Sequence, residues 1–228
     1  MPKTWFGPGS LAFLKGLKKN NRREWFEPRK PEYQREVLDP LRAVAEELDV
    51  RFARLAPEFE ANPKRSLFRI YRDVRFSKDK SPYKTHLAAS FPWVSADGSW
   101  DRGEGGVGGY FHFQPGEMYL GGGMWHPEPA RLAAWRAHVM ADRGGVHTAI
   151  EDPRFLKAFG PVEGERTKRV PAGVFADDPD VELLKLKQVL FGRRLSDADV
   201  QSSRLPVLMA DSFATAVPVM RLLASLSA

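Results

Sequence analysis

Cysteine is absent from the 228-residue sequence. This absence excludes disulfide bonds, a thiolate nucleophile, and zinc or iron–sulfur sites built on cysteine. Long apolar runs are scarce too, because none approaches the ~20 residues that cross a bilayer. The first ten residues lack the basic-then-apolar order of a signal peptide. We therefore expect a cytoplasmic protein without a membrane partner.

The excess of positive over negative charge is also small: the chain has 35 basic and 29 acidic residues and a formal net charge of +6. Basic domains attract nucleic acid and phosphorylated metabolites. Acidic residues interspersed through positions 24–60 argue against a continuous basic stripe. A phosphorylated small molecule is therefore the favoured partner, and nucleic acid stays open as the less favoured one. The sequence specifies no cofactor and no oligomeric state.

What is present is a globular composition, 43% hydrophobic and 28% charged, enough to bury a core. Apolar residues recur at helical spacing in the first part of the chain, alternate with polar residues in the middle, and recur at helical spacing again in the last part. This order predicts the α+β class: an antiparallel β-sheet packed with helices from the N- and C-terminal parts, in one domain over 1–228. The expected helices are 10–19, 22–29, 31–55 with a kink at Pro40, 127–142, 153–159, 179–189, and a last region from Ser196 that Pro206 and Pro218 interrupt. The expected strands are 66–76, 82–91, and a hairpin of 110–114 with 117–120, preceded by a loop over 95–109.

A dense polar cluster lies between Arg69 and His86, with three Arg, three Lys, two Asp, two Tyr and one His in eighteen residues. Alternation places four polar side chains on one face of the expected strand, whereas Arg72 shares the apolar face. Arginine forks hold phosphate or carboxylate with two hydrogen bonds, and lysine adds a point charge. The sequence thus predicts an anion pocket. Its ligand-binding candidates are Arg69, Arg72, Arg75, Lys80, Tyr83 and Lys84.

Proton transfer in such a pocket would need an acid or a base beside the cations. The candidates are Asp73, Asp79 and His126, and whether the protein is an enzyme stays open. Two other interpretations compete. The cluster is either an internal salt-bridge network in a structural or interaction module, or part of a nucleic-acid surface. Convergence of the side chains in one cleft would favour the pocket, and pairwise neutralisation would favour the network.

Glycine-rich segments add two motifs. Gly121 to Gly123 precede His126 and Pro127, and either expose backbone N–H groups to an anion or let two strands approach closely. Residues 103–108 match G-x-G-x-x-G, but a strand follows them, whereas the dinucleotide fingerprint opens a helix. The five histidines show no paired spacing, so no metal site is predicted.

Several of these motifs resemble one known family. They are Phe13-Leu14, Asn20-Asn21-Arg22, Glu24-Trp25-Phe26, Lys30 with Tyr33, Phe68 to Asp73, Arg75 to Thr85, Gly121 to Met124 before His126-Pro127, and Pro171 with Gly173, Pro179 and Lys187. Over roughly residues 5–225 the chain is similar to the family called domain of unknown function 2461 (DUF2461). The resemblance implies a bacterial-type cytosolic single domain and carries no established activity. The motif at Asn21 and Arg22 is interpreted as a helix end with Trp25 and Phe26 as core anchors, or as further donors to the pocket.

Overall fold

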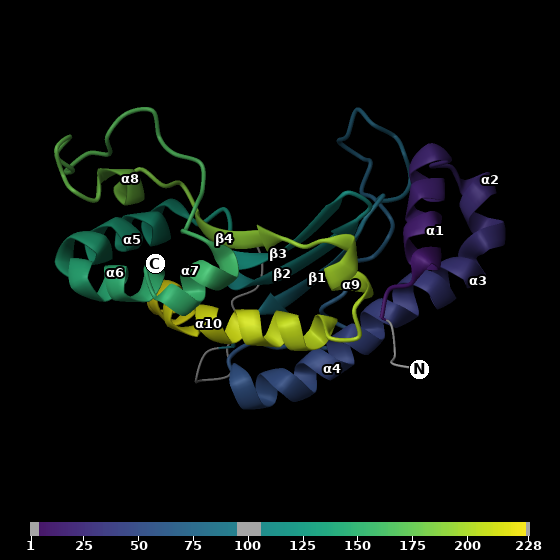
Figure 1. Ribbon diagram of the computed structural model, residues 1–228. Helices are drawn as coiled ribbons and strands as arrows, with labels where there is room; N and C mark the ends of the chain where they lie inside the picture. The colour runs from purple at the N-terminus through teal and green to yellow at the C-terminus, as the bar shows by residue number, and fades with distance from the viewer. Residues whose placement is uncertain (1–4, 95–105, 227–228) are drawn as a thin grey trace.

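A four-stranded antiparallel sheet organises the chain in the computed structural model, which describes residues 5–94 and 106–226. The strands lie in the order β1-β2-β3-β4, so each pairs with its neighbour in sequence. Their bounds are β1 Leu87–Pro92, β2 Val107–Gln114, β3 Glu117–Met124 and β4 Val189–Arg194. The expected hairpin is confirmed as β2 and β3, joined by a turn at Pro115-Gly116. The predicted α+β class is confirmed as well, with helices from both ends of the chain packed on the sheet (Figure 1).

The helices fall into an N-terminal and a C-terminal group. The first group is α1 Pro8–Lys19, α2 Arg23–Phe26, a 3-10 turn Glu27–Arg29, α3 Lys30–Tyr33, a π turn Gln34–Leu38 and α4 Asp39–Leu55. The second is α5 Pro129–Ala141, α6 Arg143–Ile150, α7 Pro153–Phe159, α8 Val181–Leu184, α9 Asp197–Gln201 and α10 Leu205–Ser225. The kink expected at Pro40 takes the form of the π turn, after which Pro40 lies in the first turn of α4. Ser196 caps α9 with a capping box, as predicted.

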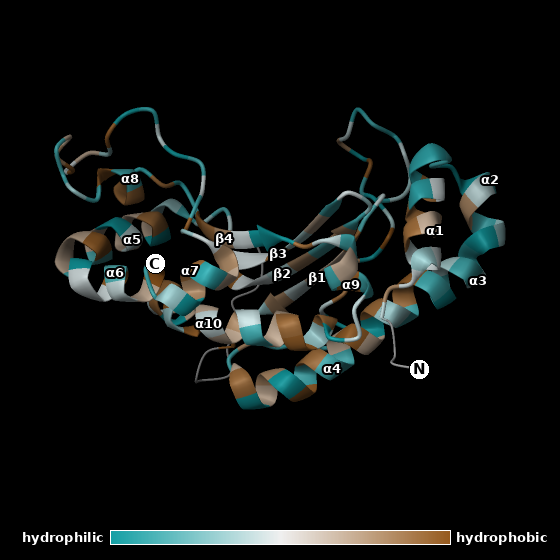
Figure 2. Cartoon of the chain, in the orientation of Figure 1, coloured by the Kyte–Doolittle hydropathy of each residue, from teal (hydrophilic) through white to brown (hydrophobic). Residues whose placement is uncertain are grey.

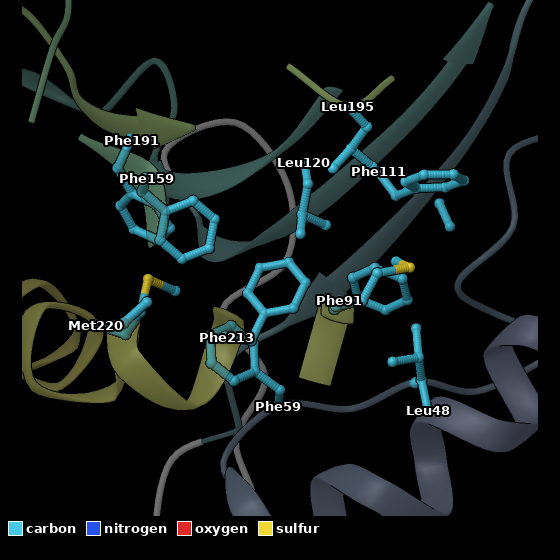
Figure 3. Packing of buried hydrophobic residues seen from close by; sticks show 14 of the residues in the cluster. Leu48, Phe59, Phe91, Phe111, Leu120, Phe159, Phe191, Leu195, Phe213 and Met220 are labelled. Atoms are coloured by element: carbon cyan, nitrogen blue, oxygen red, sulfur yellow. The ribbon is translucent and has the colours of Figure 1, made fainter. Parts of the chain in front are cut away.

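Helices α4 and α10 cover one face of the sheet (Figure 1). Side chains alternate along a strand, so Phe111 and Phe113 of β2 are fully buried on this face. Phe213 of α10 lies between the sheet and α4, with Phe91 and Phe59 around it (Figure 3). Apolar and polar residues alternate along α4, whose apolar side faces this core (Figure 2). The opposite face of the sheet has no helix over it in the described part of the chain (Figure 1).

Helix α10 passes through a proline. It runs 21 residues without a break at Pro218, so the expected interruption there is wrong, and Pro206 instead lies in its first turn. The helix also has the length and the mean hydropathy, 1.5, of a membrane span, which corrects the expectation of no such run. Half of that span is buried inside the protein, and its buried side packs against α4, β2 and β3. It is therefore built as a core helix.

Pro218→Ala should stabilise the protein by about 2 kcal/mol. Proline costs about 3 kcal/mol relative to alanine inside a helix, and its stiffening of the unfolded chain offsets up to about 1 kcal/mol. Because Pro218 is exposed, its removal leaves no cavity. Urea unfolding measures the difference. The matched control is Pro129→Ala, an exposed proline that begins α5, which should change the free energy of unfolding by less than about 0.5 kcal/mol.

Two expected elements are wrong. Residues 66–76 form no strand, and their backbone pairs with β1 and the residues before it at isolated bridges, Leu67 with Ala89 and Tyr71 with Tyr83. Asp73 instead bonds the N–H of Arg75 locally, which favours a turn, and Pro82 has no N–H to donate. Helix 179–189 shortens to the four residues of α8, and Val189 already begins β4. The expected strand 82–91 is shorter, as β1, and most of the expected loop 95–109 lies outside the described residues.

Candidate functional site

A groove of about 910 Å³ lies on the helix-free face of the sheet. The strand β2 supplies alternate residues to this face, among them Gly108, Tyr110 and His112. The segment 65–68 forms one wall, and the end of β3 with residues 163 and 190 forms another. The lining residues are Arg65, Phe68, Ser90, Pro92, Gly106, Val107, Gly108, Gly109, Tyr110, Tyr119, Gly122, Gly123, Trp125, Glu163 and Leu190.

Glycines make the floor of the groove. In the antiparallel register Gly108 faces Gly123, and Gly121 faces both Tyr110 and Gly192. A Cβ on Gly122 would lie 2.6 Å from the carbonyl oxygen of Gly108, so the two strand backbones approach each other too closely for a side chain there. This supports the interpretation of the triple glycine as a close approach of strands. It also leaves the peptide planes of the floor accessible to a flat molecule.

Aromatic rings stand around this floor. The rings of Phe68 and Tyr110 meet edge to face at 6.3 Å, and Trp125 is 55% exposed at the other end. The Tyr119 ring lies along Gly121 and Gly192, and its hydroxyl donates to the carbonyl oxygen of Phe191 at 3.1 Å. Burial, and then the nearby carboxylate of Glu163, raise the pKa of Tyr119 to about 12. The aromatic part of the wall is therefore apolar, Arg65 and Glu163 add one charge of each sign to the lining, and Tyr119 is a neutral phenol at pH 7.

Two cations stand on the Phe68 side of the groove. The ammonium group of Lys84 lies 5.1 Å from the centre of the Phe68 ring, in a cation–π contact. Burial, with a smaller contribution from Arg69, lowers the pKa of Lys84. Arg69 is exposed, and neither residue forms an ion pair with a carboxylate within residues 5–94 and 106–226. Neither cation is thus held in an ion pair within these ranges, and the carboxylate that the charge of Arg69 is shown to influence is that of Asp73.

A tyrosine and two histidines continue the face along β2. The Tyr110 hydroxyl and His112 Nδ1 are 3.1 Å apart, and the rings of His86 and His112 stack with centroids 4.4 Å apart. Burial, then electrostatic repulsion from His112 and Lys84 when these are protonated, lower the pKa of His86 to about 4. Burial also lowers the pKa of His112, against a weaker opposite effect of Glu117. Both imidazoles are therefore neutral at pH 7.

The remaining cations of the predicted pocket have partners of their own, a carboxylate for each arginine and a backbone carbonyl for the lysine. Arg75 Nη2 lies 2.7 Å from Asp73 Oδ2, and Arg72 pairs with Asp79. Lys80 donates to the carbonyl oxygen of Val74 at 3.0 Å. The structure therefore brings these side chains together as a self-contained turn.

Two of the candidate proton-transfer groups belong to that turn. Hydrogen bonds from Arg75 lower the pKa of Asp73 to about 2. Hydrogen bonds from Ser81, and then from Arg72, lower the pKa of Asp79. Both carboxylates therefore stay ionised at pH 7. His126, the third candidate, is exposed beside Trp125 with a φ of 47° and is not among the lining residues.

Tyr83 lies in the core, 1% exposed. Its ring stacks on Phe26 at 4.1 Å, and its hydroxyl contacts Glu27 at 3.3 Å. The side chain of Asn21 bonds the backbone of Tyr83 twice, from Nδ2 to the carbonyl oxygen at 2.8 Å and from the Tyr83 N–H to Oδ1 at 3.1 Å. The Asn21 motif thus fastens the segment 66–86 to the N-terminal helices.

A second cavity of about 590 Å³ lies between α6, α7 and α8. Asp180, 6% exposed, accepts from Arg143 and lies 2.7 Å from His147 Nε2. The other ring nitrogen of His147 is 2.8 Å from Glu151, and these hydrogen bonds, with that from Glu151 first, raise the pKa of His147. Every group in this network has a partner, which indicates a structural role.

Sequence reasoning missed Tyr110, His112, Tyr119 and Glu163 as groove or groove-side residues. The signal for Tyr110 and His112 was present, because they alternate with Phe111 and Phe113 in the predicted hairpin and so share its other face. Glu163 belongs to a long connection whose path the local sequence does not indicate. Within the described ranges, no three His, Asp or Glu side chains gather in a way that could hold a metal ion.

Comparison with known proteins gives one match. The family model for a conserved hypothetical protein, DUF2461, covers residues 9–221. No curated protein and no solved structure matches the chain. Since the family model spans most of the chain, from α1 into α10, the protein belongs to the DUF2461 family.

Proposed function

We propose that the protein binds a small organic anion with a flat, unsaturated body in the groove on the helix-free face of the sheet. The observation that carries the proposal is the pairing of a glycine-floored, aromatic-walled groove with the two cations Arg69 and Lys84 beside it. A concave site with mostly apolar walls and few polar groups is the usual form of a small-molecule site. The ring of such a ligand would lie over the glycines, and its phosphate or carboxylate would face Lys84.

The charges on the Phe68 side of the groove support an anion rather than a neutral ligand, whereas the carboxylate of Glu163 lies among the lining residues elsewhere. Lys84 is partly buried against the Phe68 ring, where a charge interacts more strongly than in water. Arg72, Arg75 and Lys80 are held by partners of their own and supply little to the groove. The ligand-binding part of the predicted cluster is therefore Arg69 with Lys84, and the rest supports the loop that carries them.

Four probes test the proposal: two aromatic anions, adenosine monophosphate and 4-hydroxybenzoate, and two fragments, adenosine, which lacks the anion, and ribose 5-phosphate, which lacks the base. We expect a saturable rise in Tm with adenosine monophosphate or with 4-hydroxybenzoate, and a weaker one with either fragment. Lys84→Gln should weaken the bound probe about tenfold, equivalent to about 1.4 kcal/mol of binding free energy. Phe68→Ala should weaken it by a similar factor, because an aromatic contact is worth about 0.5–1.5 kcal/mol.

The chain offers close controls. Lys80→Gln removes a neighbouring charge that is held on a backbone carbonyl, and Phe76→Ala removes a phenylalanine that is 95% exposed in the same segment. Both variants should bind as the wild type does, measured by isothermal titration calorimetry. The proposal is rejected if neither aromatic anion binds saturably, or if Lys80→Gln weakens binding as much as Lys84→Gln.

A further inference from the structure

We propose that Tyr110 is a nucleophile of the groove and that His112 is the base that takes its proton. This rests on the proposed function, because the electrophile is an ester centre of the anion held there. In the step, the Tyr110 oxygen forms a bond to the electrophilic atom while the bond to the leaving group breaks. The phenolic proton moves to His112 Nδ1, and the leaving group departs with the electron pair. No oxidant or reductant is needed.

The geometry of β2 brings the two groups together. Residues two apart on a strand point to the same face, and the Tyr110 hydroxyl lies 3.1 Å from His112 Nδ1. His86 stacks on the His112 ring, with 30° between the planes, and helps to hold its orientation. A nucleophile, a base in contact with it and a third group that orients the base is the general form of an activated nucleophile.

Tyr110 differs from the other tyrosines in having a histidine in contact with its hydroxyl. All of the tyrosines lie in the described part of the chain. The hydroxyl of Tyr83 contacts Glu27 and that of Tyr119 contacts a backbone carbonyl, while no hydrogen bond to an imidazole is present at Tyr33 or Tyr71. Among the five, Tyr110 combines a place in the groove wall with a hydroxyl on a histidine.

The protonation states support the arrangement. Burial raises the pKa of Tyr110, so its phenol does not ionise by itself at neutral pH and needs a base in contact. The titratable and charged groups near His112 are Tyr110, His86, Glu117 and Tyr119, its register partner on β3, with Lys84 beyond His86. Burial lowers the pKa of His112, so its imidazole is unprotonated and free to accept a proton at pH 7.

An arylsulfonyl fluoride reports this reactivity without knowledge of the natural ligand. The probe 4-(fluorosulfonyl)benzoate has a flat ring and a carboxylate, and tyrosine oxygen displaces its fluoride. We expect it to label Tyr110 in preference to Tyr71, which is 44% exposed without a histidine partner. Peptide mapping by mass spectrometry gives the site and the rate. In His112→Asn, which keeps an acceptor but cannot take the proton, the rate should fall about 10²-fold, as for loss of a general base.

His138→Asn, a substitution in α5 away from β2, is the matched control and should label at the wild-type rate. A second measurement needs no variant: the rate of Tyr110 labelling should rise with pH along the titration of His112 followed by NMR. Equal labelling of Tyr110 and Tyr71, an unchanged rate in His112→Asn, or a rate that does not follow the His112 titration would overturn the proposal.

The uncharged probe phenylmethanesulfonyl fluoride separates this proposal from the preceding one. His112-dependent labelling by the uncharged probe, with no saturation by the carboxylated one, would keep the Tyr110–His112 pair and reject anion binding. Saturable binding of 4-hydroxybenzoate together with an unreactive Tyr110 would keep the groove and reject the nucleophile.

Discussion

Gly123→Ala should lower the free energy of unfolding by about 4 kcal/mol, since a strained backbone and an overfilled site each cost about 1–3 kcal/mol. Gly123 has a backbone φ of +124°, a conformation that residues other than glycine rarely adopt. An alanine Cβ there would overlap the carbonyl oxygen of Val189 in β4. Because this obstacle is backbone, β3 and β4 would have to separate at the floor of the groove.

Gly116→Ala is the matched control for the backbone strain alone. Gly116 has a φ of +83°, but a Cβ at that position meets nothing within 4 Å. The expected cost is about 1 kcal/mol, the penalty of a left-handed conformation. Urea unfolding of both variants, followed by tryptophan fluorescence, separates strain from overlap. Equal losses in the two variants would show that β4 yields to a methyl group and that the close approach is not required.

Tyr83→Ala should lower the free energy of unfolding by about 3–5 kcal/mol, the usual cost of removing a buried aromatic ring. The ring stacks on Phe26 and is 1% exposed, so its loss leaves a cavity between the segment 66–86 and the N-terminal helices. Chemical denaturation gives the value. Tyr83→Phe keeps the ring and loses only the contact with Glu27, so its cost should be about 1 kcal/mol.

This comparison decides between the two interpretations of Tyr83. A large loss in the alanine variant with a small one in the phenylalanine variant is the result for a core residue. If Tyr83→Ala instead folds with a loss below about 1 kcal/mol and no longer binds the probes used for the groove, Tyr83 belongs to the ligand site.

Local patterns predicted the elements whose contacts are also local. The hairpin of β2 and β3 follows from alternation around Pro115-Gly116, and α7 follows from a proline start and a glycine end. The segment 66–76 alternates equally well but forms no strand. Its neighbour is β1, and the pairing is interrupted by Pro82 and by the local hydrogen bonds of Asp73. Alternating apolar and polar residues therefore form a strand only where a neighbouring strand offers unbroken backbone pairing.

The ligand-binding residues stay a prediction, and the same limit applies to them. The sequence placed Arg69 and Lys84 in one cluster, and the structure puts them beside the groove. It could not assign Arg72, Arg75 and Lys80, because choosing between a ligand and a neighbouring carboxylate requires the path of the turn. Glu163 and Leu190 reach the groove from segments far along the chain. Composition and residue spacing do not indicate which distant segments come together in space.

The closure of the core by α10 has a consequence for how the chain folds. Phe52 of α4 meets Phe213 of α10 edge to face with ring centroids 5.7 Å apart, and Trp5 donates to the carbonyl oxygen of Ser203, 198 positions away. Contacts between such remote residues must form before the apolar side of the sheet is shielded. Folding becomes slower as the fraction of contacts between sequence-distant residues increases. Until α10 docks, the sides of Phe59 and Phe91 that meet Phe213 face solvent and can adhere to other chains. We therefore expect partly folded chains, in which α10 has not yet docked, to aggregate more readily than the native protein.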